Sequence, residues 1–313
     1  MVLKQGKQVN DNDPVGADIW SEWLLHRRHA DDPEYGRVVQ TSVLDYADRL
    51  LDGAQLDKGM TLVDLGAGEG LVAFRAIERI GASLQAILTD VSAHMLQYAE
   101  SLSQVRNIRS QCTFLQASAE RLEGISDAIA DAVTSRAVLA YVADKGAALR
   151  EVFRVLKPGG RLSIAEPLLQ DEAFHARALR NRIEDRSRPV ERFVTLVHRW
   201  KSAQFPDTEE AAAQNPLVNY SERDLLNLVR HAGFAEAHLQ LHIDVVPALT
   251  TSWEVFIGTS PHPWAPSLRQ ILAERFSAEE AEFFESILRP TVESGKNMTT
   301  TRVIYLQARR PLT

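Results

Sequence analysis

Three glycines at alternate positions, Gly66, Gly68 and Gly70, restrict the possible folds of this chain more than any other feature. They follow a short apolar run over residues 60–65 and precede a helical pattern over residues 71–80. Glycine allows a tight turn and close approach of the backbone to a ligand, because it has no Cβ atom. The helix beyond the turn presents free N–H groups and the positive end of its dipole, so the turn predicts a site for a carboxylate or phosphate.

Strand-like and helical segments alternate beyond this turn. Further apolar segments typical of strands lie at residues 84–89, 112–116, 131–134 and 161–165. Helical patterns lie between them at residues 92–103 and 145–156, and residues 157–160 form a sharp turn. Strands that alternate with helices build a parallel sheet covered on both faces. The prediction is an α/β fold with a Rossmann-like, doubly wound sheet.

Three helical regions flank or interrupt this alternation. The first covers residues 18–51, where Trp20, Trp23 and Leu24 recur at helical spacing before a break at residues 31–33. The others interrupt the chain at about residues 167–220 and 250–297, and Ser221 with Asp224 predicts a capped helix start between them. We therefore expect an N-terminal tail and helical lid over residues 1–55, and one domain with helical insertions over residues 56–313.

Composition excludes several classes of protein. The formal net charge of −7 disfavours general binding to nucleic acid, since an acidic protein repels a phosphate backbone. The single cysteine, Cys112, rules out an internal disulfide. No apolar run approaches the ~20 residues that cross a bilayer, and residues 1–14 lack the apolar stretch of a signal peptide. These features favour a cytoplasmic protein that does not bind membranes.

Two aspartates restrict the class of ligand that the glycine-rich turn is predicted to bind. Asp64 precedes the first glycine, where it would repel a pyrophosphate but could hold an ammonium group. Leu71 occupies the place of the last glycine in a dinucleotide-binding fingerprint, which counts against a nicotinamide cofactor. Asp90 ends the second strand, where a carboxylate can accept both hydrogen bonds of a ribose diol.

Five motifs in this order resemble those of class I S-adenosylmethionine-dependent methyltransferases, in particular the small-molecule group that includes the ubiquinone/menaquinone C-methyltransferases. They lie at residues 64–70, 89–90, 117–120, 131–141 and 155–160. The resemblance covers residues 56–169 well and residues 221–308 loosely. It implies a seven-stranded sheet whose last two strands, at about residues 238–246 and 302–308, form an antiparallel edge.

The resemblance also implies the cofactor S-adenosylmethionine and the residues that would bind it. Asp64, Gly66, Ala67 and Gly68 would hold its methionine part, and Asp90 its ribose. The adenine would lie near Val91, Met95, Ser118, Ala119 and Glu120, with Ser118 standing where many relatives carry an aspartate. Ser135 and Arg136 would line the site of methyl transfer.

The methyl acceptor is predicted to be a small molecule, because the two helical insertions favour an enclosed pocket. Glu166 follows the fifth strand, where ligands dock in open α/β sheets, and is a candidate for contact with substrate. Residues 175–201 carry eight Lys or Arg against three Asp or Glu, which indicates either a solvated helix face or recognition of an anionic acceptor. Arg136, Tyr141 and Arg177 are further candidates for binding the acceptor.

A general base is needed only if the acceptor carries its proton at the working pH. Candidates by residue type and location are Glu166, Tyr141 and His26, with His29 and His175 as further choices. No metal site is expected, because no carboxylate or cysteine accompanies His26 and His29 at a ligand spacing. Two alternatives stay open: a cofactor-binding protein of the same fold without catalysis, and a nicotinamide-dependent oxidoreductase.

Overall fold

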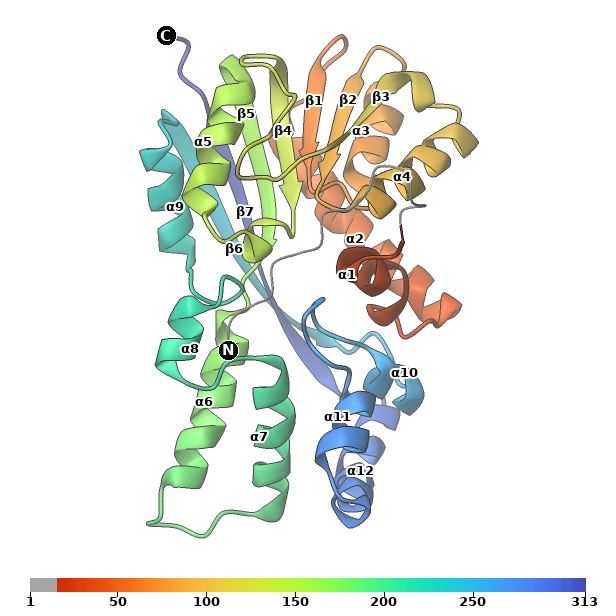
Figure 1. Cartoon of the computed structure of the whole chain (residues 1–313), viewed down its shortest axis with the longest axis vertical. Coiled ribbons are helices and arrows are strands. Elements are labelled where there is room, and N and C mark those ends of the chain that lie inside the picture. The colour runs from red at the N-terminus through yellow and green to blue at the C-terminus, as the bar shows by residue number, and fades with distance from the viewer. Residues whose placement is uncertain (1–15) are drawn as a thin grey trace.

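The computed structural model describes residues 16–313 and contains one seven-stranded sheet in the order β3-β2-β1-β4-β5-β7-β6 (Figure 1). The strands are β1 (Thr61–Leu65), β2 (Gln85–Asp90), β3 (Cys112–Gln116), β4 (Ala130–Arg136), β5 (Leu156–Pro167), β6 (Glu236–Pro247) and β7 (Met298–Arg309). Strands β1 to β5 are mutually parallel, whereas β7 is antiparallel to β5 and β6. The predicted sheet with an antiparallel edge is confirmed. The predicted polar tail, residues 1–14, lies outside the described residues.

Helices cover both faces of the sheet because its strand residues alternate between two cores. Leu62 and Ala132 point to the core formed with α2 (Pro33–Ala54), α3 (Leu71–Ile80) and α4 (Ala93–Val105). Their neighbours Val63 and Val133 point to the core formed with α5 (Lys145–Val155) and α9 (Glu222–His231). Successive residues of a strand face opposite sides, so apolar runs such as residues 62–65 serve both cores.

Side chains at the helix starts place these helices as the sequence predicts. The Asp32 carboxylate accepts a 2.7 Å hydrogen bond from the Tyr35 N–H and caps α2, which begins at Pro33. Ser92 caps α4 through the Met95 N–H. Ser221 and Asp224 form the predicted capping box of α9. Each cap satisfies backbone donors that a helix leaves unpaired in its first turn.

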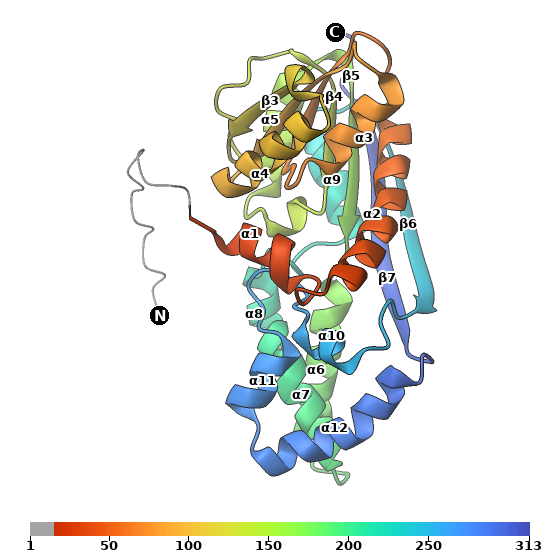
Figure 2. The ribbon, with the colours of Figure 1, turned by 90° about the vertical axis from the view of Figure 1, so that its right-hand side faces the viewer.

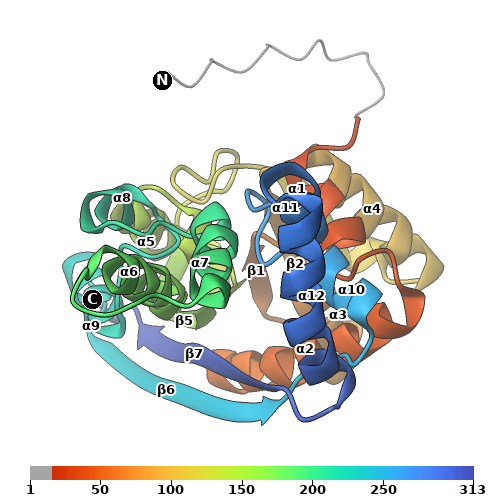
Figure 3. The ribbon, with the colours of Figure 1, turned by 90° about the horizontal axis from the view of Figure 1, so that it is seen from below.

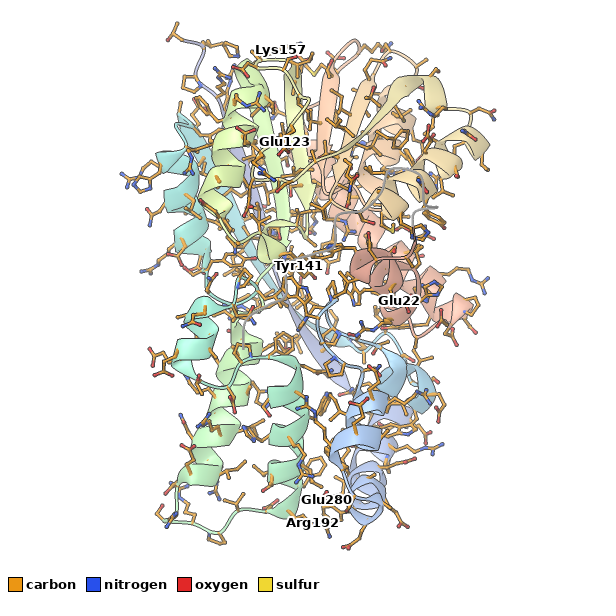
Figure 4. All side chains as sticks on the ribbon, viewed as in Figure 1. Glu22, Glu123, Tyr141, Lys157, Arg192 and Glu280 are labelled. Atoms are coloured by element: carbon orange, nitrogen blue, oxygen red, sulfur yellow. The ribbon has the colours of Figure 1, made fainter. Side chains whose placement is uncertain are left out.

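The two interruptions of the sheet meet in one helical group, which we define as α6, α7, α10, α11 and α12. Its elements are α6 (Gln170–Glu184), α7 (Arg192–Gln204), α10 (Trp253–Gly258), α11 (Leu268–Arg275) and α12 (Ala278–Glu293); the short α8 (Glu209–Gln214) leads back to the sheet. Leu196 of α7 packs in one core with Trp253 and Phe284. Arg199 of α7 also pairs with Glu280 of α12 at 2.7 Å. Figure 3 shows α6 and α7 facing α10–α12 from below, and Figure 4 labels Arg192 and Glu280 where α7 and α12 meet.

A two-stranded ribbon carries half of this group away from the sheet. Strands β6 and β7 are longer than the predicted 238–246 and 302–308, and residues 243–247 and 298–302 pair with each other beyond the last ladder pair of β5 with β7. β5 pairs with β7 only from Val303 to Arg309. The ribbon therefore extends beyond the carboxyl end of β5. Helices α10–α12, which connect its two strands, lie below the strand ends in Figure 1.

Candidate functional site

A cavity of about 330 Å³ lies at the carboxyl ends of β1, β2 and β4. Its lining comes from the glycine-rich turn, the loops after β2, β3 and β4, and the N-terminal helices. The candidates that line it are Asp64, Gly66, Ala67, Gly68, Asp90, Val91, Ser118, Ala119, Glu120, Arg136 and Tyr141. Residues spread over nearly 80 positions of the sequence therefore meet at one site, as the carboxyl ends of neighbouring parallel strands do.

The glycine-rich turn admits no side chain at its first glycine. Gly66 has a φ angle of +62°, in the left-handed region that disfavours side chains. A Cβ atom at this position would lie 2.4 Å from Cγ2 of Val138, in the loop after β4. The turn therefore packs so closely against the Val138 side chain that a side chain at position 66 would have to displace it.

Asp90 joins the turn to the end of β2. Its Oδ2 atom accepts a 2.9 Å hydrogen bond from the Gly68 N–H, and its Oδ1 atom accepts one of the same length from the Ser92 N–H. Only 9% of the residue is exposed, and this burial raises the pKa of the carboxyl group. The hydrogen bonds from the backbone act in the opposite direction, but their effect is smaller. Each oxygen keeps a second lone pair, so the carboxylate can accept two further hydrogen bonds from a ligand in the cavity.

Asp64 is the most deeply buried acid of the cavity, with 2% exposure. Its carboxylate accepts hydrogen bonds from the Thr134 hydroxyl at 2.8 Å and from the Ala73 N–H at 3.2 Å. Burial raises the pKa of Asp64 to about 7, although these bonds and the nearby Arg136 favour the ionised form. A cationic group entering the cavity would shift this acid toward its carboxylate form.

The N-terminal helices cover the cavity. After α1 (Ile19–Glu22) comes the π-helical turn η1 (Trp23–Arg27), and Trp20, Trp23, Leu24 and Arg28 contribute to the lining. The Trp23 indole N–H donates a 2.9 Å hydrogen bond to the Ser260 carbonyl, in the loop between α10 and α11. Figure 2 shows α1 between the strand ends and the helical group, so this lid contacts both parts.

Three aromatic rings pack together where the lid, the sheet and the helical group meet, and two of them, Trp20 and Tyr141, line the cavity. Tyr141 belongs to the short helix η3 (Leu139–Tyr141), and its ring centroid lies 5.1 Å from that of Trp20. Trp264 packs edge-on against both, at 5.9 Å from Trp20 and 5.6 Å from Tyr141. Figure 4 shows Tyr141 at this junction. Burial raises the pKa of its phenol, which therefore remains a hydrogen-bond donor at neutral pH.

Glu166 lies behind the cavity wall and is absent from the lining. Its Oε1 atom accepts hydrogen bonds from the Val138 N–H at 2.8 Å and the Leu139 N–H at 2.9 Å, and Oε2 accepts one from Ala140 at 3.4 Å. Burial raises the pKa of this carboxyl group. Through these hydrogen bonds, Glu166 holds in place the loop that carries Val138 and Tyr141.

Six other candidates also lie outside the lining, and of these His29 is on the lid and His175 lines a different cavity. Met95 and Ser135 are buried beneath it, and the Ser135 hydroxyl has no partner among the described residues. His26 is exposed on the lid and pairs with Asp31 at 2.6 Å. Arg177 lies on α6, where its guanidinium is 3.6 Å from Glu209 and packs over the Phe174 ring. The cavity does not bring these side chains together.

Sequence reasoning missed Arg28 and Trp264. Arg28 follows Trp20 and Leu24 at intervals of four, a spacing that places all three on one helix face, and this signal could have identified it. Trp264 lies in the insertion and packs against the lining residues Trp20 and Tyr141 without belonging to the lining itself; no local pattern indicates this contact between distant segments. Within residues 16–313, no cluster of three or more His, Cys, Asp or Glu could hold a metal, and no helix is long and apolar enough to span a bilayer.

Comparison with known proteins identifies relatives of this chain. A family model described as a methyltransferase domain matches residues 56–222, a little over half of the chain. A ubiquinone/menaquinone biosynthesis C-methyltransferase from Serratia proteamaculans is 36% identical over 122 residues, which are 38% of this chain and 48% of that protein. The corresponding Rhizobium meliloti protein is 28% identical over 200 residues, 62% of this chain and 72% of that protein. The match to the Serratia protein thus spans about half of its length.

Two solved structures share the fold at low sequence identity. The YcgJ protein from Bacillus subtilis has a TM-score of 0.55 and 18% identity, over 86% of this chain and 99% of that chain. A phosphoethanolamine N-methyltransferase 2 from Haemonchus contortus, solved with phosphomonomethylethanolamine and S-adenosylhomocysteine, has a TM-score of 0.51 and 15% identity. This second match covers 96% of this chain and 61% of that chain. At identities this low, the structural similarity shows a common fold alone.

Proposed function

The chain belongs to the methyltransferase-domain family, as a class I S-adenosylmethionine-dependent methyltransferase, and we propose that it methylates a small molecule in the cavity described above. The observation that carries the proposal is the meeting of Asp64, the turn at Gly66–Gly68, and Asp90 in one cavity. When bound, S-adenosylmethionine supplies a methyl group activated by a positively charged sulfur.

The residues of the cavity fit the parts of this cofactor. The narrow backbone cradle at Gly66 and Gly68 suits its methionine part, and the Asp64 carboxylate suits the ammonium group. Asp90 has the free lone pairs that ribose hydroxyls require. Val91, Ser118, Ala119 and Glu120 would surround the adenine, while Met95 supports that wall from below.

Positioning and exclusion of water are the contributions we assign to the protein. Alignment of two reacting groups lowers a barrier by up to about 7–11 kcal/mol in the most favourable intramolecular cases. Trp20, Tyr141 and Trp264 would exclude water, and the Tyr141 phenol would orient the acceptor by donating a hydrogen bond. The mechanism uses neither His26 nor Glu166 as a base, since His26 faces solvent and Glu166 binds backbone N–H groups.

Calorimetric titration of S-adenosylmethionine and S-adenosylhomocysteine into the wild type and Asp90→Ala tests the proposal. We expect micromolar binding to the wild type, about −8 kcal/mol. Removal of the Asp90 carboxylate should weaken binding about 10- to 100-fold, because hydrogen bonds to a charged group contribute about 1.5–3 kcal/mol. Asp244→Ala, an exposed aspartate outside the cavity, is the matched control. Absence of binding to the wild type would refute the proposal.

The same preparation distinguishes the two alternatives. Tight binding of S-adenosylmethionine without product in any pool of small acceptors would favour a cofactor-binding protein without catalysis. Binding of a nicotinamide dinucleotide in place of S-adenosylmethionine would favour the oxidoreductase. Efficient methylation of bulk RNA or of intact proteins would contradict the enclosed pocket.

A further inference from the structure

A second cavity, of about 540 Å³, adjoins the first. It lies between α2, the end of β5, the start of α6 and the start of β7, below the carboxyl ends of the strands. Arg136 and Ala137 belong to the linings of both cavities. A molecule in the second cavity would therefore meet a molecule in the first at the loop that follows β4.

The lining of the second cavity is apolar over much of its surface, with contributions from Val43, Tyr46, Leu168 and Val303. Most of its charges are already paired. Asp171 pairs with Arg302, and Glu172 pairs with Lys201 at 3.0 Å. His175 and Arg136 are the remaining basic side chains of this lining.

The Arg136 guanidinium forms no ion pair or hydrogen bond with any residue in the described part of the chain, 16–313. The acids whose negative charge favours the Arg136 cation are Glu69, Asp64 and Glu166. The Asp64 carboxylate already binds Thr134 and Ala73, and the Glu166 carboxylate binds three backbone N–H groups. Glu69 forms no ion pair with Arg136 within the described residues, so Arg136 is a partly buried cation without a direct ion-pair partner there.

A second guanidinium reinforces this excess of positive charge. Arg28, on the lid, lines the first cavity. Burial is the main cause that lowers the pKa of Arg136, and the positive charge of Arg28 lowers this pKa further. The Nε atom of Arg28 is buried and has no hydrogen-bond partner among the described residues. Two neighbouring arginines without a carboxylate partner are unfavourable in a protein interior unless an anion joins them.

We propose that the methyl acceptor carries a carboxylate or phosphate group that Arg136 binds, with its apolar body in the second cavity. The inference rests on the proposed function and deepens it by naming the acceptor's chemical class. A planar guanidinium can bind either oxyanion through two parallel hydrogen bonds. Arg136 would then hold the acceptor at the only wall segment, residues 136–137, that the two described linings share.

The test uses the full chain saturated with S-adenosylhomocysteine and three probes of matched size: benzoate, phenyl phosphate and neutral benzamide. Calorimetry should show at least one of the two anions binding ten-fold or more tightly than benzamide, and the better anion identifies the acceptor's charged group. Arg136→Gln should reduce this preference to less than three-fold. Arg136→Lys, which keeps the charge but loses the planar fork, should keep part of it.

Two further variants locate the effect. Arg177→Gln removes an arginine of α6 that lies outside both linings, and it should leave the binding of all three probes unchanged. Thr300 is an exposed residue at the rim of the second cavity, so Thr300→Trp should weaken charged and neutral probes alike. It should leave S-adenosylhomocysteine binding unchanged, because Thr300 is absent from the lining of the first cavity.

Equal binding of the anions and benzamide to the wild type would overturn the inference, as would an anion preference that survives in Arg136→Gln. A third result would also overturn the inference: Arg136→Gln weakens the binding of S-adenosylhomocysteine ten-fold but leaves the binding of 5′-methylthioadenosine, which lacks the carboxylate, unchanged. That result would mean that Arg136 binds the carboxylate of the cofactor and not that of the acceptor. Failure of the wild type to bind S-adenosylhomocysteine at all would refute the proposed function instead, so the two failures are distinguishable.

Discussion

The indole N–H of Trp23 donates a 2.9 Å hydrogen bond to the backbone carbonyl of Ser260, 237 residues further along the chain. Arg27 strengthens the same junction, since its guanidinium donates to the Pro263 carbonyl at 3.1 Å and its own carbonyl accepts from the Ser260 N–H at 3.0 Å. The lid over the cavity is therefore attached to the helical group as well as to the sheet.

Trp23→Phe should loosen this attachment while preserving the aromatic packing. Loss of one partly buried hydrogen bond costs about 1 kcal/mol, so the lid should open about five-fold more often. We expect dissociation of S-adenosylhomocysteine to become faster by a similar factor in stopped-flow displacement. Tyr98→Phe, which removes an exposed hydroxyl outside the cavity, is the control. An unchanged dissociation rate would show that this bond does not gate release.

Gly66→Ala should destabilise the protein through contact with Val138 in addition to backbone strain. Gly59 provides the matched control, because it also has a positive φ angle, +78°, but a Cβ there would meet nothing within 4 Å. We expect Gly59→Ala to cost about 1 kcal/mol of unfolding free energy. Gly66→Ala should cost about 1–3 kcal/mol more, as over-packing does.

The double variant Gly66→Ala/Val138→Ala separates the two contributions. Urea unfolding should show that shortening Val138 recovers part of the loss, since the methyl groups that meet the new Cβ are then absent. Equal losses for Gly59→Ala and Gly66→Ala would contradict the close approach of the turn to the loop after β4.

Asp64 should make stability fall as the pH rises from about 4 to about 7. Its pKa of about 7 in the folded state lies above the ordinary value of 3.8 for an aspartate, so between these pH values the folded state holds a proton that the unfolded state has lost. Below pH 4 both states are protonated and the folded state keeps its full advantage. The loss across this window is on the order of 4 kcal/mol for a buried group. Urea unfolding at pH 5 and pH 7 should show the stability of Asp64→Asn, relative to wild type, rising with pH.

Binding of a cofactor that places an ammonium group on Asp64 should release a proton near pH 6.5. The cation lowers the pKa of the acid, so a carboxyl group that is partly protonated in the free protein ionises in the complex. Calorimetry of S-adenosylhomocysteine in two buffers with different ionisation enthalpies measures this proton. The release should vanish in Asp64→Asn; its persistence there would place the titrating group elsewhere.

Glu166→Ala should be much less stable than Glu166→Gln. Alanine leaves the N–H groups of Val138, Leu139 and Ala140 without their acceptor, at about 1–3 kcal/mol for each buried group. Glutamine keeps one oxygen in place. Thermal unfolding measures the difference, which we expect to be several kcal/mol. If Glu166 acts on substrate instead, both variants would lose turnover while keeping wild-type stability.

The sheet and the cofactor wall were predictable because they depend on local patterns. An apolar run that ends in Gly66, Gly68 and Gly70 specifies a strand, a turn and a helix within a few residues. Asp64 and Asp90 lie in the last two residues of their strands, and parallel strands bring such positions to a common edge. Nearly all of the predicted cofactor residues line one cavity for this reason; Met95 and Ser135 lie just behind it.

The acceptor side was less predictable because it depends on side-chain direction and on contacts between distant segments. Glu166 lies next to the last residue of β5, much as Asp90 ends β2, yet its carboxylate binds the backbone of the loop after β4 and does not line the cavity, whereas Arg136 does. Residue type and position alone do not distinguish these two outcomes. Arg177 is similar, since a helix of mixed charge does not reveal which face meets a cavity.

By itself, the sequence determined the doubly wound sheet, the order of its elements and the turn that shapes the cofactor wall, because each depends on the spacing of residues close together in the chain. The tertiary structure alone decided that residues 167–220 and 250–297 contribute to a common helical core around Leu196 and Phe284, and that Trp264 reaches Tyr141. It also decided that Arg136 lies between two cavities without a close carboxylate. These relationships depend on the length of the β6–β7 ribbon and on packing between segments far apart in sequence, which no local pattern encodes.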